Sequence, residues 1–357
     1  MKRSLRLSLQ RLLLFFHVDT HGPRLARRHI ILSPRAPAAL DRPMADRPRD
    51  GKPIGLIGLG LMGTAICERL LARGYDLVIQ NRTADKAVPL VSRGARWSDN
   101  PLRECDRVII SLYTTEVVEE VLGQLEDAYE PGKLLIDTTT GDPQRTAKLG
   151  ARLASRGVDY LEVPISGSSE QTRRGQSTAM VAGPMRSLEA CRDLLDAIAA
   201  KTYYVGHWGD GVRMKLVTNL VLGLNRAVLA EGLVFAKSIG LSTERALEVL
   251  LNSPASSRTM ETKGPKMVNS EFAPQAKLSQ HLKDVRLILA EAARTSRELP
   301  LTALHAQLLE RAEAEGYGEL DNSVIIRAIE DGLLPATASR AATRGIEALS
   351  SLLDEVE

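Results

Sequence analysis

A lysine and an asparagine stand four residues apart, at Lys215 and Asn219, in the stretch GDGVRMKLVTN. Side chains at this spacing lie on the same face of an α-helix, one turn apart. The run that follows is apolar around most of its circumference, and such a helix is largely buried. A buried lysine must be paired or have a lowered pKa, which makes it a useful proton donor or acceptor. The pair therefore predicts a proton-transfer site. The plainer alternative is that the two residues belong to a polar, solvent-exposed stripe of the helix.

The elements that would position this pair begin at Pro53. Short apolar strands alternate with helical patterns, which is typical of βαβ crossovers and a mainly parallel sheet. Pro89 lies inside the second expected helix and conflicts with it. The strands are expected at residues 54–57, 77–80, 107–112, 134–138, 158–163, 178–183 and 202–205.

From Gly209 to about Glu330 the pattern is nearly all helical. We therefore expect an α/β fold, with an N-terminal Rossmann-type doubly wound sheet followed by an all-α C-terminal domain. The expected division is a disordered or non-native extension at residues 1–50, an NAD(P)-binding Rossmann domain at 51–207, and a helical substrate and oligomerisation domain at 208–350.

Residues 1–50 are basic, with no acidic residue before Asp19. Three interpretations compete: a cleaved signal, an organelle transit segment, and an unstructured extension or artefact of start-codon choice. The last is preferred, because the apolar core is short, no convincing cleavage site follows it, and Met44 stands just ahead of the first expected strand.

Composition narrows the function. The 357 residues are 44% hydrophobic and 25% charged, which suits two domains with cores, and the net charge is only +3. Much of the basic excess lies in the first fifty residues, so nucleic acid is not an expected partner. No uninterrupted apolar run approaches a membrane span, so no membrane is expected. The three cysteines have no metal-binding spacing, which predicts no metal and reduced thiols in a cytoplasmic location.

The first turn, GLGLMG, predicts a dinucleotide site. Gly58, Gly60 and Gly63 form GxGxxG after a strand and before a helix. A tight turn, a backbone close to the pyrophosphate and a helix N-terminus aimed at it are what phosphate binding requires. Leu61 and Met62 complete the loop, and all five residues are candidate cofactor contacts.

Cofactor choice depends on QNRT, at the end of the second expected strand. An NAD-specific site usually places an acid here for the ribose hydroxyls. Asn81 has no charge that would repel a 2′-phosphate, Arg82 can pair with one, and Thr83 can donate to one. NADP is therefore favoured, and NAD is possible. The alternative interpretation is that Arg82 is a solvated loop residue with no role in cofactor choice.

Two further polar islands lie in apolar surroundings. The turn VPISGSS offers the hydroxyl of Ser166 beside backbone amides freed by Gly167, which can hold a carboxylate. HLKDVRL supplies Lys283 and Asp284, which without the other motifs would indicate an exposed charge pair.

Taken together, these motifs resemble the β-hydroxyacid dehydrogenase family, which includes 3-hydroxyisobutyrate dehydrogenase and the glyoxylate or succinic semialdehyde reductases. The resemblance runs from about Ile54 to about Glu330. GLIGLGLMG resembles the nucleotide loop, DTTTGDP the segment near the nicotinamide, and VPISGSS the substrate turn. GDGVRMK with Asn219 resembles the catalytic helix, and LKDVRL the late lysine motif, all in the family's order.

The resemblance implies hydride transfer between a nicotinamide cofactor and a small β-hydroxyacid or its semialdehyde. Lys215 would be the general acid/base with Asn219 binding substrate beside it. It further implies a small carboxylate substrate and a homodimer or homotetramer. Ser166, Gly167 and Ser168 would hold the substrate. Leu112, Tyr113, Thr140 and Lys283 would bind the cofactor, with Lys283 closing over the active site.

Some positions depart from the family pattern. Ser168 replaces the second glycine of the substrate turn, Thr218 stands where asparagine or histidine is common, and Tyr113 stands where proline is frequent. Imine reductases share the architecture but generally lack the lysine at 215, and 6-phosphogluconate dehydrogenases have a histidine at 218. A non-catalytic NADP-binding regulatory protein is the alternative outside enzymology.

Overall fold

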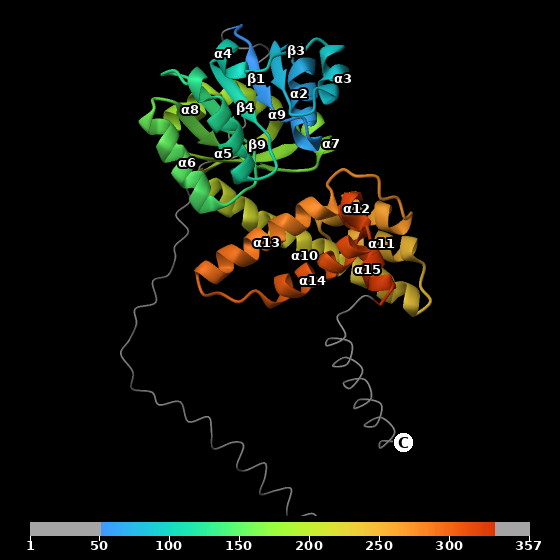
Figure 1. The fold of residues 1–357 in the computed structure, drawn as a ribbon. Coiled ribbons are helices and arrows are strands. Elements are labelled where there is room, and N and C mark those ends of the chain that lie inside the picture. Colours follow the sequence, from blue (N-terminus) through green and yellow to red (C-terminus); the bar gives the residue numbers. More distant parts are fainter. Residues whose placement is uncertain (1–50, 333–357) are drawn as a thin grey trace, which may run out of the picture. The chain divides into compact units, whose positions relative to one another are not determined.

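The structure is a computed structural model that describes residues 51–332, all of which lie within one compact unit. The extension expected at 1–50 and the last part of the expected helical domain, 333–350, lie outside the described residues. Within the described range every named strand ends by Gly206, and the named elements from Asp210 onward are helical (Figure 1).

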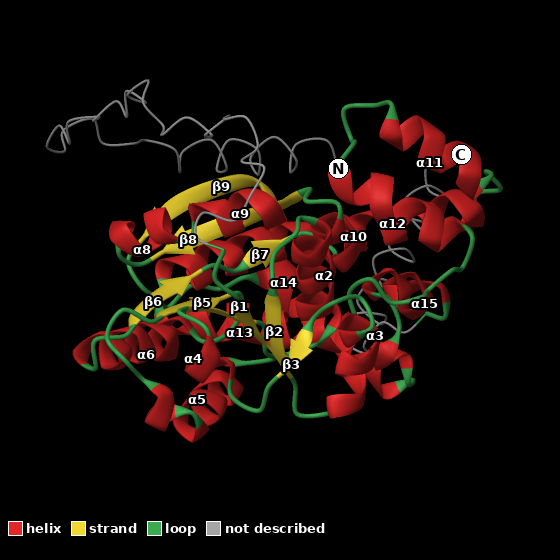
Figure 2. Cartoon of the chain, turned by 90° about the horizontal axis from the view of Figure 1, so that it is seen from above, coloured by secondary structure: helices red, strands yellow, loops and turns green. Residues whose placement is uncertain are grey.

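Nine strands in the described part of the chain form one sheet, in the order β3-β2-β1-β4-β5-β6-β8-β7, with β9 also paired to β8 (Figure 2). The strands from β3 to β6 are parallel, whereas β8 pairs antiparallel with β6 and β7. The strands are β1 (Ile54–Ile57), β2 (Leu77–Gln80), β3 (Arg96–Trp97), β4 (Arg107–Ile110), β5 (Leu134–Asp137), β6 (Asp159–Glu162), β7 (Ile165–Ser166), β8 (Ser177–Ala182) and β9 (Ala199–Gly206).

Helices cover both faces of this sheet, and a separate helical half follows it. Around the sheet lie α2 (Leu61–Ala72), α3 (Val88–Val91), α4 (Pro101–Glu104), α5 (Thr115–Gln124), α6 (Pro143–Ser155), α7 (Ser169–Arg173), α8 (Met185–Ala190) and α9 (Arg192–Ile198). The helical half contains α10 (Asp210–Ser238), α11 (Thr243–Leu251), α12 (Arg258–Val268), α13 (Leu278–Arg294), α14 (Pro300–Ala314) and α15 (Ile325–Glu330).

Two hydrophobic clusters lie on opposite faces of the sheet because successive strand residues point in opposite directions. Along β1, Leu56 joins the cluster under α2 and α9, and Ile57 joins the one under α5 and α6. Ile109 and Ile110 divide in the same way along β4. Strands buried on both faces are typical of parallel sheets with helices on either side. The predicted fold class, a doubly wound sheet followed by an all-α half, is confirmed.

Two local features were not expected. β3 and β7 have only two residues each, which is too short for any sequence period to appear. The segment around Pro89 is a 3₁₀ helix at Ala84–Ala87 followed by α3, whose first turn contains the proline. The N–H that proline lacks would be unpaired there in any case, which removes the expected conflict.

The helix α10 runs through the helical half and contacts α11, α12, α13, α14 and α15. Among the described helices it is the one long and apolar enough to cross a membrane by length and composition, although charged residues interrupt its apolar run. Its packed face includes Lys215, Asn219 and Arg226, all buried. The core helix of a folded domain passes the same compositional test, so this finding is weak evidence for a membrane span.

The start of α10 is held by the buried carboxylate of Glu162, at the end of β6. Its Oε2 accepts a 2.6 Å hydrogen bond from Gly209 N, and its Oε1 accepts one from Val212 N. Backbone N–H groups at a helix start have no partner within the helix, so this side chain satisfies two of them. Burial raises the pKa of Glu162 to about 7, although the two backbone hydrogen bonds act to lower it.

We expect Glu162→Gln to lower the free energy of unfolding by about 1 to 3 kcal/mol, because the amide turns an N–H donor toward one of two backbone donors. The pKa of Glu162 is higher in the folded protein than in the unfolded chain, so the protonated side chain adds to the free energy of unfolding. This stability is fully present below the unfolded pKa near 4.5 and is lost as the pH rises through about 7. The stability gap between wild type and variant should therefore be wider at pH 5 than at pH 8. Urea unfolding at both values checks this, with the exposed Glu248→Gln as control; a gap that narrows toward pH 5 contradicts it.

Candidate active site

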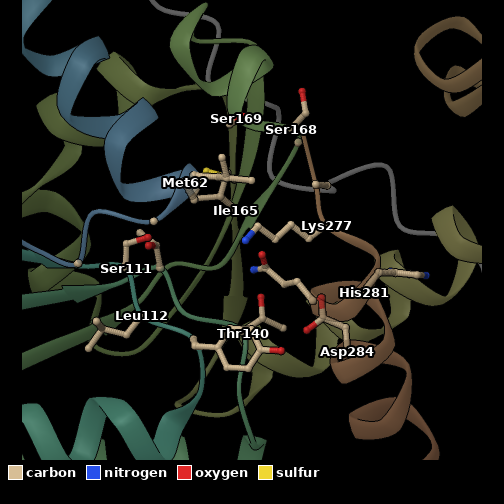
Figure 3. A pocket seen from close by; sticks show the side chains of 18 of the residues that line it. Met62, Ser111, Leu112, Thr140, Ile165, Ser168, Ser169, Lys277, His281 and Asp284 are labelled. Carbon is tan, nitrogen blue, oxygen red and sulfur yellow. The ribbon is translucent and has the colours of Figure 1, made fainter. Parts of the chain in front are cut away.

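A cleft with a volume of about 970 Å³ is lined by the nucleotide loop, the end of β2, the turn after β7, and faces of α10, α12 and α13. Figure 3 shows Ser111, Leu112 and Thr140 on the side formed by the Rossmann half, and His281 and Asp284 on the side formed by α13. The cleft therefore brings together residues from both halves of the described chain.

The nucleotide loop has the shape that a dinucleotide needs. Gly58 has φ +101°, and a Cβ at this position would collide with the carbonyl oxygen of Ser111. A Cβ on Gly63 would collide with the carbonyl oxygen of Gly58, whereas one on Gly60 would meet nothing within 4 Å. Gly60 is also the N-cap of α2 and offers no side-chain cap, so the N–H groups of the first turn are free for a phosphate. The two close approaches and the open space between them fit a pyrophosphate.

Residues at the end of β2 have two different tasks. Asn81 Oδ1 accepts a 2.8 Å hydrogen bond from Leu59 N, and Asn81 Nδ2 donates to the carbonyl of Thr83 at 2.9 Å. Asn81 thus holds the nucleotide loop against the strand end. Arg82 and Thr83 are exposed and line the cleft, and neither side chain has a hydrogen-bonding or ionic partner within residues 51–332.

The ends of β4 and β5 are tied together by threonines. Thr138 Oγ1 donates to the carbonyl of Ile110 at 2.8 Å, and Leu112 N donates to Thr139 Oγ1 at 3.1 Å. These bonds place Leu112, Tyr113 and Thr140 on the cleft wall. Ligands of open parallel sheets bind outside the carboxyl ends of the strands, and the cleft lies there.

Lys215 and Asn219 face the cleft from α10, as their spacing predicts, and both are buried. Asn219 Nδ2 donates a 2.8 Å hydrogen bond to Asp284 Oδ2 on α13. This bond fixes the orientation of the Asn219 amide, because its nitrogen must face the accepting carboxylate oxygen. The ammonium group of Lys215 has no hydrogen-bond partner among the described residues and is left to interact with a ligand in the cleft.

Burial lowers the pKa of Lys215 to about 8, from an ordinary value near 10.5. The negative charge of Asp284 opposes this shift and the positive charge of Lys283 adds to it. An amine that titrates close to neutral pH can both give and take a proton during a reaction.

Lys283 is not among the residues that line the cleft. Its Nζ donates to the carbonyl oxygens of Thr140 at 2.6 Å and Tyr113 at 3.0 Å, and lies 5.2 Å from the centre of the Tyr113 ring. The same Nζ is 2.9 Å from Asp284 Oδ1, a charge contact without hydrogen-bond alignment. Lys283 therefore joins α13 to the loops after β4 and β5.

The turn after β7 is partly committed to local structure. Ser168 is the N-cap of α7, where its Oγ accepts from Gln171 N and its own N–H donates to Gln171 Oε1. Gly167 has φ +152°, and a Cβ there would lie 2.6 Å from Ser177 Oγ. Ser166 lines the cleft, and its hydroxyl has no partner within the described range.

Two protein-family models match the chain. One, described as the NAD binding domain of 6-phosphogluconate dehydrogenase, matches residues 53–206. The other, described as NAD-binding of NADP-dependent 3-hydroxyisobutyrate dehydrogenase, matches residues 209–329. Glyoxylate/succinic semialdehyde reductase 1 of Arabidopsis thaliana is 31% identical over 78% of this chain and 98% of its own length. The chain belongs to the β-hydroxyacid dehydrogenase family.

Other relatives extend the comparison. The 2-(hydroxymethyl)glutarate dehydrogenase of Eubacterium barkeri is 32% identical over 78% of this chain and 94% of its own length. The human cytokine-like nuclear factor N-PAC is 30% identical over 78% of this chain but only 51% of its own length. As a family member with an intact dinucleotide loop, the chain is an NAD(P)-dependent oxidoreductase of the class that acts on CH–OH groups.

Solved structures agree in fold. Psf3 in complex with NADP⁺ and 2-OPP is 26% identical, with a TM-score of 0.71 over 77% of this chain and 99% of that one. An imine reductase from Pseudomonas sp. is 21% identical, with a TM-score of 0.55 over 78% of this chain and 99% of that one. At that identity the second likeness concerns the fold alone.

For this β-hydroxyacid dehydrogenase the structure gathers nearly all of the sequence-predicted site residues around one cleft. Gly63 and Lys283 are the two that do not line it: Gly63 packs against Gly58, and Lys283 donates hydrogen bonds to the loops after β4 and β5. The lining residues from the prediction are Gly58, Gly60, Leu61, Met62, Asn81, Arg82, Thr83, Leu112, Tyr113, Thr140, Ser166, Gly167, Ser168, Lys215 and Asn219.

Several lining residues were missed. Asp284 was seen only as half of a charge pair, although it is the partner of Asn219. Arg226 continues the face of Lys215 and Asn219 along α10, and this helical spacing could have revealed it. Thr259, His281 and Asn322 had no sequence signal, because their place depends on how α12 and α13 pack. In residues 51–332 no cluster of histidine, cysteine or acidic residues could hold a metal ion.

Proposed function

We propose that this protein is an NADP-dependent reductase of small semialdehydes of β-hydroxyacids, with Lys215 as the proton donor. The observation that carries the proposal is a buried lysine with a pKa lowered to about 8, in the same cleft as the dinucleotide loop. A reduced nicotinamide supplies a hydride to the carbonyl carbon, and the oxygen then needs a proton.

The residues of this chain divide that work. Lys215 would donate the proton, and its cationic form would stabilise the negative charge that develops on the oxygen. Asn219, fixed by Asp284, would contact the substrate beside Lys215. The free hydroxyl of Ser166 and the amide of Gly167 would hold the substrate carboxylate, with Ser168 shaping the turn through its cap. Oxidation of the hydroxyacid would follow the same path in reverse.

The proposal is tested by following NADPH oxidation with glyoxylate, succinic semialdehyde, methylmalonate semialdehyde and a cyclic imine. Turnover of an acid semialdehyde supports it. Turnover of the imine alone would favour an imine reductase, and that activity should survive loss of Lys215. Tight NADPH binding without turnover of any compound would favour a non-catalytic regulatory protein.

The exposed, unpaired Arg82 supports the choice of NADP over NAD. We expect Arg82→Ala to weaken NADPH binding by about 10- to 100-fold, since a charge-assisted bond contributes about 1.5 to 3 kcal/mol. NADH affinity should change by less than about twofold, because its ribose has no 2′-phosphate to lose a partner. Fluorescence titration with both cofactors measures this, with the exposed Arg245→Ala as control; an unchanged NADPH to NADH affinity ratio refutes the assignment.

The proposal includes a cytoplasmic location and a homodimer or homotetramer. Association through the helical half is supported by exposed apolar side chains along α10. Val217, Val221, Val228 and Phe235 are each at least half exposed and recur at helical spacing.

A further inference from the structure

A buried arginine lies on the same helix as the Lys215 and Asn219 pair. Arg226 follows Lys215 by eleven residues on α10, which is about three turns of helix, so the two side chains share a face. Arg226 lines the same cleft as Lys215, and only 4% of its surface is exposed.

The guanidinium of Arg226 is unpaired. Its Nε and Nη2 atoms are buried and have no hydrogen-bond partner among the described residues. Burial lowers its pKa to about 10, which the charge of Asp321 opposes, so it remains a cation at neutral pH. A buried charge without a partner is costly, and natural proteins seldom keep one without a use.

The carboxylates near Arg226 are already engaged. Asp321 accepts hydrogen bonds from Lys263 Nζ at 2.8 and 3.0 Å, from the backbone of Gln275 and Ala276, and from Ser323. Asp284 is held by Asn219 and Lys283. The positive charge of Arg226 at the cleft is therefore not paired with either of these carboxylates.

Other residues that line the cleft also have unsatisfied polar atoms. Thr259 Oγ1, on α12, which packs against α10, is buried without a partner, and so are His281 Nε2 and Asn322 Oδ1. His281 is packed 5.3 Å from His305, ring centre to ring centre. Burial and the nearby positive charge of Arg226 hold the pKa of His281 well below its usual range, so it is neutral. Several unpaired polar groups in the same cleft as one unpaired cation indicate a binding site.

We propose that Arg226, with the Thr259 hydroxyl, binds a second anionic group of the substrate. The substrate class is then an oxoacid with a carboxylate or phosphate at each end of its chain. The Ser166 turn holds one anionic group, and Arg226 holds the other beyond Lys215. This inference rests on the proposed function for the position of the reacting carbonyl, but the subsite can be measured by binding alone.

The test is calorimetric titration of the NADP-loaded protein with succinate, glutarate, adipate and pimelate, each beside its monomethyl ester. We expect at least one diacid to bind at least about tenfold more tightly than its ester, because an arginine that pairs with a carboxylate forms two charge-assisted bonds. A parallel titration with 4-phosphonobutyrate distinguishes a phosphate-like group from a carboxylate.

Variants assign the preference to Arg226. Arg226→Met should bring the ratio of diacid to ester affinity down to about one, and Arg226→Lys should leave an intermediate ratio, since lysine keeps the charge but not the planar pair of donors. The exposed Arg245→Met serves as the matched control and should keep the wild-type ratio. If Arg226→Met does not fold, the affinity ratios of the wild type and of Arg226→Lys still test whether Arg226 binds the second anionic group.

Three results would overturn the inference: no diacid preferred over its ester by the wild type, a preference that persists in Arg226→Met, or a variant whose loss is in NADP affinity instead. Failure of the proposed function has a different signature. If the protein prefers diacids but oxidises NADPH with no semialdehyde, the subsite is supported and the proposed reductase activity is contradicted. If it reduces a semialdehyde without preferring diacids, the activity is supported and the subsite is contradicted.

Discussion

Replacement of Lys215 by methionine is expected to lower kcat for semialdehyde reduction by about 100- to 10,000-fold, the range that a positioned general acid contributes. Methionine fills similar space but carries no proton. The nucleotide loop lies on the other half of the cleft, so the Kd for NADPH should stay within about twofold of the wild type. Stopped-flow and steady-state NADPH oxidation measure kcat, and fluorescence titration measures Kd.

Lys237→Met is the matched control, because Lys237 lies on the same helix but is exposed and paired with Glu330. It should keep wild-type kcat. Equal turnover in Lys215→Met would remove the lysine from the mechanism, and a joint loss of turnover and cofactor binding would mark it as structural.

The lowered pKa of Lys215 also sets the direction of the pH dependence. Reduction requires the ammonium form, so kcat for reduction should fall as the pH rises through about 8. Oxidation requires the neutral amine, so its kcat should rise through the same pH. Profiles from pH 6 to 10 in both directions check this, and two profiles with the same slope near pH 8 would contradict the role.

Replacement of Gly63 by alanine is expected to weaken NADPH binding by about 100-fold and to lower the free energy of unfolding by about 3 kcal/mol. The new methyl group would collide with the carbonyl oxygen of Gly58, a backbone atom that cannot rotate away. Either the loop or the first turn of α2 must move, and both hold the pyrophosphate site. Urea unfolding of the cofactor-free protein and NADPH titration measure the two effects.

Gly60→Ala separates the fold from the binding site. A Cβ at Gly60 meets nothing within 4 Å, and its φ of −75° suits any residue. This variant should unfold like the wild type without cofactor yet bind NADPH more weakly, because the methyl group enters the space where the pyrophosphate lies. If both glycine variants lost stability equally, the space beside Gly60 would not be the cofactor's.

The sequence predicted those features that depend on neighbouring residues. The GxGxxG loop and the shared face of Lys215 and Asn219 each follow from spacing within one turn or one helix. The strand interiors are apolar because both faces are buried, so their position in the chain could be read directly. Two-residue strands such as β3 and β7 are too short to leave such a pattern.

The missed features depend on packing between distant segments. Asp284 lies 65 residues from Asn219 in sequence, so their hydrogen bond requires the arrangement of α10 against α13. Ser168 was predicted to hold the substrate carboxylate, but its side chain caps α7 in a capping box with Gln171, a role that its spacing from Gln171 could have indicated. No local sequence pattern could predict that Arg226 is unpaired, because this depends on every residue that packs around it.

The most direct test of the central claim is transfer of deuterium from NADPH labelled at the reactive C4 position to an acid semialdehyde, with the hydroxyacid product analysed by mass spectrometry. The account predicts a product one mass unit heavier with the wild-type protein and only traces of it with Lys215→Met. Tight NADPH binding with no deuterium in any hydroxyacid would contradict the account, since the cleft would then hold the cofactor without performing the reduction.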